Sequence, residues 1–142
     1  MSQPMTDLDT LLASMRPELN NGVYVFSSIP LHTDIKALLP VATFREREGL
    51  TLIVDEATAQ REGLQILFRA AWITLTVHSD LQAVGLTAAF AKALGDAGIS
   101  CNVVAAAFHD HIFVPFESAG NAMAQLSRLQ SLAQQNILPA VD

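Results

Sequence analysis

The second half of the chain carries an alternating segment followed at once by a helical pattern, and this succession most constrains the fold. Residues 71–78 alternate apolar and polar side chains, as a strand with one buried face does. Residues 83–97 then place apolar side chains at helical spacing, and Gly98 follows in the position where helices commonly end. A strand that leads into a helix predicts a mixed α+β unit, because the helix must bury its apolar face against the sheet.

A hairpin and a second helix complete this pattern. Residues 102–116 predict two strands with a tight turn at His109 and Asp110, and residues 118–134 predict the last helix. Residues 137–141 add a final short strand. The predicted order is βαββαβ, which is typical of a ferredoxin-like unit with helices on one face of an antiparallel sheet.

The first half repeats this order in reduced form behind a leading helix. A loop takes the place of its first crossover helix. We interpret the two halves as a weak internal repeat, with one unit and the leading helix in residues 1–69 and the other unit in residues 70–142. The predicted elements of the first half are a helix from Thr6, a strand at 22–28, a loop at 29–40, a hairpin at 42–54, a helix at 55–62 and a short strand at 64–69.

Length, charge and cysteine content exclude several classes of function. A chain of 142 residues suits one compact domain or two very small ones. The net charge of −6 disfavours nucleic acids and anionic membrane surfaces, because both require a basic patch. The single cysteine, Cys101, leaves no internal disulfide and fits a reducing compartment. No segment has the pattern of a targeting peptide or a membrane span, so we expect a cytoplasmic protein.

The segment ITLTVHSDLQAVGLTAAFAKALGDAGISCNVVAAAFHDHIFVP resembles an ACT domain through Asp80, Gly85-Leu86 and Gly98-Ile99 and the strands around them. More narrowly, the chain is similar to a bacterial family of small tandem ACT-like proteins, and YVFSS and FREREGLTLIV extend this likeness through the first half. The resemblance implies two ferredoxin-like units without a catalytic domain. It implies an amino acid or similar small carboxylate effector at the interface between units, no cofactor, and an unidentified enzyme or transporter as the regulated partner.

The start of the predicted helix near Ala83 is the candidate ligand site. A helix start offers free N–H groups and a positive dipole end, which can hold a carboxylate. Ser79 or Asp80 is expected to cap the helix, and Gly85 leaves room for a ligand. Asn102 either contacts the ligand or, alternatively, bonds its own backbone in a turn. With the resemblance, the expected ligand-binding residues are His78, Ser79, Asp80, Ala83, Val84, Gly85, Leu86, Asn102 and Val103.

Two other readings of the function stay open. His78, His109 and His111, with Asp110, could bind a metal or serve an enzyme. However, His109 and His111 flank a predicted turn, and the chain has no HExxH or comparable spacing, so we expect neither a metal nor catalysis. The remaining alternative is a structural or partner-binding module that has lost its ligand.

The strand predicted at residues 102–108 is apolar and uncharged. A ferredoxin-like order places it at a sheet edge, and natural proteins cover such edges. We expect it to pair with the other unit, or with a second chain in a C2 homodimer.

Overall fold

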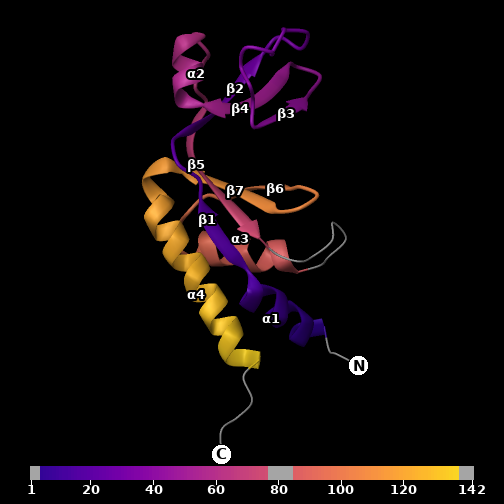
Figure 1. The fold of residues 1–142 in the computed structure, drawn as a ribbon, viewed down its shortest axis with the longest axis vertical. Helices are drawn as coiled ribbons and strands as arrows, with labels where there is room; N and C mark the ends of the chain where they lie inside the picture. The colour runs from indigo at the N-terminus through magenta and orange to yellow at the C-terminus, as the bar shows by residue number, and fades with distance from the viewer. Residues whose placement is uncertain (1–3, 77–84, 138–142) are drawn as a thin grey trace, which may run out of the picture.

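The structure is a computed structural model, and it describes residues 4–76 and 85–137, with the backbone alone for residues 4–7. One antiparallel sheet runs through the molecule in the order β3-β4-β2-β5-β7-β6, and β1 also pairs with β5 (Figure 1). The elements are α1 (Pro4–Ser14), β1 (Arg16–Leu19), β2 (Tyr24–Ile29), β3 (Ala42–Arg45), β4 (Leu50–Asp55), α2 (Glu56–Arg61), β5 (Phe68–Thr76), α3 (Leu86–Asp96), β6 (Asn102–Ala105), β7 (Asp110–Pro115), the 3-10 turn η1 (Phe116–Ser118) and α4 (Ala119–Ile137).

Strand β5 belongs to both halves of the sheet. Residues 68–70 pair with β2, residues 73–76 pair with β1 on the same edge, and β7 lies along the opposite edge. The upper half of Figure 1 has the order β3-β4-β2-β5, and the lower half has the order β6-β7-β5-β1. Each half therefore has the four-strand arrangement of a ferredoxin-like unit, and the two units share one strand.

Strand β1 is the element that the sequence did not predict. It occupies the outer position of the lower half, where we expected a strand from residues 137–141. Ile137 ends α4 instead, and the rest of that segment lies outside the described residues. The sequence of β1 is RPEL, in which a proline and two charges hide any strand signal. Its pairing with β5, from Arg16 opposite Thr76 to Leu19 opposite Ile73, depends on tertiary structure.

Helix α1 precedes the upper half in the sequence but packs against the lower half. Leu12 and Met15 lie in the same buried cluster as Phe90 and Leu126. The side chains of Gln130 and Gln134 on α4 also donate hydrogen bonds to the carbonyl of Ala13, at 3.1 and 3.2 Å. Helix α1 and strand β1 therefore belong to the lower half of the structure, and β5 (residues 68–76) is shared by both halves. The division of the chain between residues 69 and 70 stays a prediction.

The described helices cover one face of the sheet, as predicted. Helices α1, α3 and α4 bury the lower half, and α2 with the loop at residues 30–41 buries the upper half. The two buried faces are continuous, because Val25 lies opposite Arg69 and Arg69 shares its face of β5 with Ala71. The other face has no described helix. The prediction of antiparallel ferredoxin-like units with helices on one face is confirmed.

Several boundaries differ from the prediction. The two strands expected at residues 64–69 and 71–78 form one strand, β5. Helix α3 begins at Leu86, three residues after the predicted start. The β6–β7 turn spans residues 106–109, closed by Ala106 N–H donating to the carbonyl of His109 at 3.0 Å, so Asp110 belongs to strand β7 and not to the turn. Among the described residues, no helix is long and apolar enough to cross a membrane.

Candidate functional site

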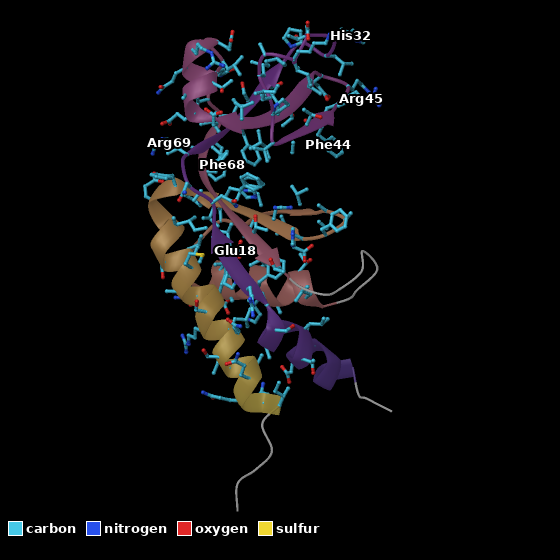
Figure 2. The ribbon with its side chains drawn as sticks, viewed as in Figure 1. Glu18, His32, Phe44, Arg45, Phe68 and Arg69 are labelled. Atoms are coloured by element: carbon cyan, nitrogen blue, oxygen red, sulfur yellow. The ribbon has the colours of Figure 1, made fainter. Side chains whose placement is uncertain are left out.

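An apolar hollow lies on the helix-free face, between the two halves of the sheet. It has a volume of about 290 Å³, and it is lined by Val41 and Ala42 from the upper half and by Trp72, Val104, Ala106, His111 and Phe113 from the lower half. None of the described side chains that line it is charged. A smaller hollow of about 160 Å³ adjoins it through Ala42 and Val104 and extends to Phe44, which lies on β3 in Figure 2.

Strand register brings the lining residues to one face. Trp72 lies opposite Phe113 on the β5–β7 pair, and Val104 lies opposite His111 on the β6–β7 pair. Ala42 approaches from β3, at the other end of the strand order. Because β3 and β6 are the two ends of the main strand order and both line the hollow, the sheet curls so that these two strands flank this site.

Aromatic rings form the floor beside the hollow and connect the two halves. Phe26 of the upper half packs edge-to-face on Phe68 and Phe113, with ring centroids 5.4 and 5.5 Å apart. Tyr24 packs edge-to-face on Trp72 at 5.1 Å. The contact with Tyr24 restricts the orientation of the Trp72 ring, because an edge-to-face pair has a preferred geometry.

His111 brings an imidazole to the lining, and hydrogen bonds set its orientation. Trp72 Nε1–H donates to His111 Nδ1 at 3.0 Å, and the Thr74 hydroxyl lies 3.4 Å from the same nitrogen. Asn20 Nδ2 in turn donates to Thr74 Oγ1 at 2.9 Å and to the carbonyl of Trp72 at 3.1 Å. An indole N–H can only donate, so Nδ1 must accept. This assigns the proton of the neutral imidazole to Nε2.

The charge state of His111 agrees with this tautomer. Burial lowers the pKa of His111, and the nearby His109 lowers it further, while Asp110 acts in the opposite direction. The site therefore presents a neutral imidazole at neutral pH, with Nε2–H as a hydrogen-bond donor.

The structure describes four of the nine residues of the predicted ligand site, namely Gly85, Leu86, Asn102 and Val103. His78, Ser79, Asp80, Ala83 and Val84 lie outside the described residues. Leu86 is buried in the lower core and Val103 packs against that core, whereas Asn102 is exposed and donates from Nδ2 to the carbonyl of Phe113 at 3.3 Å. Asn102 thus bonds the backbone of the neighbouring strand, and not its own backbone.

Gly85 lies just before α3 and not within its first turn. It occupies the N-cap position of α3 with φ 96°. The helix therefore begins later than predicted, and Ser79 and Asp80, the expected caps, lie outside the described residues. A Cβ at Gly85 would lie 3.5 Å from Cδ2 of Leu8, so α1 already occupies the space beside it.

The described part of the chain offers no metal site. The rings of His109 and His111 are 6.3 Å apart and perpendicular, and the described residues contain no group of three or more metal-binding side chains. Nδ1 of His109 is buried without a hydrogen-bond partner among these residues. Burial raises the pKa of the Cys101 thiol, which agrees with a packed and unreactive cysteine.

The sequence pointed to His111, but as a possible metal ligand, and it did not predict the hollow. The alternation in residues 71–78 did place Trp72 and Thr74 on the face opposite Ile73. Nothing local indicates that Ala42 and Val104, from distant segments, meet Trp72 there. Their contact follows from the shared strand β5.

Comparisons with known proteins agree with the two halves seen in the sheet. One ACT domain family model matches residues 3–71, and a second ACT domain model matches residues 68–128. The two matches overlap at the start of β5. No curated protein sequence matches the chain.

Solved structures resemble the chain over most of its length. A protein of unknown function from Vibrio cholerae is 48% identical with a TM-score of 0.83, covering 90% of this chain and 99% of that one. A protein from Agrobacterium tumefaciens is 15% identical with a TM-score of 0.65, covering 82% and 89%. The regulatory subunit of aspartate kinase from Thermus flavus is 12% identical with a TM-score of 0.53, covering 81% and 95%. The last two similarities concern the fold alone.

Proposed function

Because the chain belongs to the ACT domain family, with two ACT domains in tandem, we propose that it is a non-catalytic regulatory protein which binds a small effector between its units. ACT domains are regulatory modules that bind small molecules. The effector in this proposal is an amino acid or a similar small carboxylate, and an unidentified enzyme or transporter is the regulated partner. We place its action in the cytoplasm, because a lone cysteine fits a reducing compartment.

The observation that carries this proposal is the hollow on the helix-free face. Both units contribute to its lining, so a bound ligand would contact both at once. Such a ligand favours one arrangement of the two units by the difference in its affinity for the two arrangements. A volume of about 290 Å³ is at the lower end of the range for ligand pockets, which suits a molecule of amino-acid size.

Thermal-shift screening of the twenty amino acids tests the proposal. A ligand that binds only the native state stabilises it, by about 2.7 kcal/mol when its concentration is one hundred times Kd. We expect at least one amino acid to raise Tm. The variant Ala106→Leu should abolish that shift, because the larger side chain fills part of the hollow.

Ala93→Leu is the matched control. Ala93 lies on α3 and lines a different surface groove, between α3 and α4, so the same substitution there should leave the shift intact. If the shift survives Ala106→Leu, the ligand binds elsewhere, and the segment at residues 78–86 becomes the first place to look. If no amino acid raises Tm, the module without a ligand becomes the better reading.

A further inference from the structure

The lining of the hollow also indicates which parts of the effector are recognised. Resting on the function proposed above, we infer that the effector is an aromatic carboxylate or carbonyl compound: its ring enters the hollow, its oxygen accepts a hydrogen bond from Nε2–H of His111, and its amino group, if it has one, is not recognised. This assigns a ligand class to the hollow and a specific donor to His111.

The size and the walls of the hollow favour a ring. A dry apolar cavity of about 150 Å³ in another protein accommodates benzene, so about 290 Å³ has room for a substituted ring. Trp72 and Phe113 both line the hollow, and their rings are nearly parallel, with centroids 6.1 Å apart and planes at 21°. Offset stacking of a ligand ring on either of them adds to the affinity gained by burying apolar area.

The hydrogen-bonding capacity of the lining selects an acceptor. Nδ1 of His111 is already held by the Trp72 N–H, so a ligand finds only the Nε2–H donor on this ring. A carboxylate or carbonyl oxygen matches a donor, and a hydrogen bond to a charged acceptor is stronger than one to a neutral acceptor. An ammonium group has only donors to offer and would oppose this N–H.

The lining offers no hydrogen-bond acceptor for an ammonium group. The seven residues that line the hollow include no carboxylate, amide or hydroxyl side chain. An ammonium would find only the ring faces of Trp72 and Phe113, and in this proposal the ring of the ligand occupies the space beside them, so burying the ammonium there would cost its hydration without a hydrogen bond in return. A bound amino acid would therefore keep its ammonium in the water at the mouth, where it adds no affinity.

Three probes that share a phenyl ring separate these contributions. Phenylalanine carries both charged groups, 3-phenylpropanoate lacks the ammonium, and phenethylamine lacks the carboxylate. In titration calorimetry with the intact chain, we expect 3-phenylpropanoate to bind at least as tightly as phenylalanine. Phenethylamine should bind at least about tenfold more weakly, because it lacks the acceptor for His111.

His111→Phe keeps an aromatic ring but removes the donor. It should weaken 3-phenylpropanoate about tenfold and change phenethylamine less than twofold. Trp72→Phe is a second variant in case the first does not fold. It removes the N–H that holds Nδ1, so nitrogen-15 spectra of the His111 ring should show a smaller fraction of the Nε2–H tautomer, together with a severalfold loss in affinity for 3-phenylpropanoate.

The outcomes distinguish this inference from the proposed function. If Ala106→Leu abolishes phenylalanine binding but 3-phenylpropanoate does not bind, the hollow is the effector site and the ligand class inferred here is wrong. An equal loss of both acid and amine in His111→Phe would also overturn it, since the histidine would then contribute only packing. If no amino acid and no probe responds to Ala106→Leu, both proposals fail.

Discussion

Asp55 joins strand β4 to helix α2 through its carboxylate. Oδ1 accepts from the backbone N–H of Thr58 and Oδ2 accepts from its hydroxyl, both at 2.9 Å. These two hydrogen bonds to Thr58 are the main reason that the pKa of Asp55 lies below its ordinary value of 3.8. Asp55 is thus the N-cap of a short helix that has few other means of satisfying its first N–H groups.

We predict that Asp55→Ala destabilises the protein by about 1 kcal/mol at pH 7, while Asp55→Asn, which keeps an acceptor, costs much less. Because the folded-state pKa is lowered, the stabilisation is present above pH 3.8 and is lost as the pH falls through the lowered pKa. Urea unfolding at pH 7 and below pH 3.8 measures both effects. An alanine variant equal to wild type at pH 7 would contradict the cap.

His111 becomes charged when it binds a proton, whereas Asp55 becomes neutral. The pKa of each group is lowered in the folded protein, so each makes the protein more stable as the pH rises. The folded-state pKa of His111 is lowered from 6.5, chiefly by burial, so the unfolded chain binds more protons just below pH 6.5. Stability should therefore rise with pH up to about 6.5. Asp110 opposes this trend, because burial raises its pKa. We predict that His111→Phe flattens the increase in unfolding free energy on the acid side of pH 6.5, and an unchanged slope would assign the increase to other groups.

The conformation of Gly85 limits which substitutions it tolerates. The sequence placed Gly85 within the first turn of a helix that starts near Ala83. The φ of Gly85, 96°, lies in the region that L-residues avoid, at a cost of about 1–2 kcal/mol. We predict that Gly85→Ala destabilises the protein by this amount, whereas Gly95→Ala, in the last turn of α3 with no atom within 4 Å of the added Cβ, stabilises it by about 0.5–1 kcal/mol. Thermal unfolding of the two variants checks the contrast.

At the level of elements, α1 and β1 contribute to the unit that lies farthest from them in sequence. Met15 is fully buried among the residues of the lower core. We predict that Met15→Ala costs about 2–5 kcal/mol and reduces hydrogen-exchange protection in β7 before β4. Leu52→Ala, in the separate upper core, should show the reverse order. Equal loss of protection in both strands would mean that the two cores unfold as one cooperative unit.

The predictable elements are those whose signal is local. The alternation in β5, the helical spacing in α3 and α4, and the hairpin at Gly49 all survive in the structure within a few residues. Strand β1 could not be predicted, because residues 16–19 (RPEL) form a strand only by pairing with β5. The turn after β6 was misplaced because His109 and Asp110 have turn propensity, while the structure uses residues 106–109. For the same reason the fold class was predictable and the hollow was not, since Val41 and Val104 meet only after the sheet curls.

At the scale of the whole molecule, Arg69 links the two units on the helix-covered face. Its guanidinium pairs with Glu56 on α2 of the upper unit and lies 4.6 Å from the ring centroid of Phe116 in the lower unit. Figure 2 places Arg69 and Phe68 at the narrow junction between the halves. On the opposite face, Phe26 and Phe113 pack across the same junction. A ligand in the hollow would therefore bind at a junction that side-chain contacts hold together on both faces of the sheet. Such a junction suits a small shift of the two units relative to each other.

The edges of the shared sheet determine how copies of the chain can assemble. Strand β6 pairs with β7 and with no other described strand, so the expected pairing with the other unit does not form within the chain. Its sequence, NVVA, has no charge, and Val104 is 41% exposed. The other edge, β3, ends at Arg45 and continues into Glu46, Arg47 and Glu48, and charged residues of this kind discourage pairing at an edge.

We therefore predict a C2 homodimer in which β6 pairs with β6 of a second chain. Val104→Lys should convert the dimer to a monomer, because it places a charge on the interface. Phe44→Lys, at the β3 edge, where Phe44 is 71% exposed, should leave the dimer intact. Sedimentation equilibrium of wild type and both variants gives the masses directly. A wild-type mass equal to one chain would refute the dimer. If Phe44→Lys alone dissociates the dimer, the interface lies at β3. The charged residues beside β3 would then pair across the interface instead of protecting the edge.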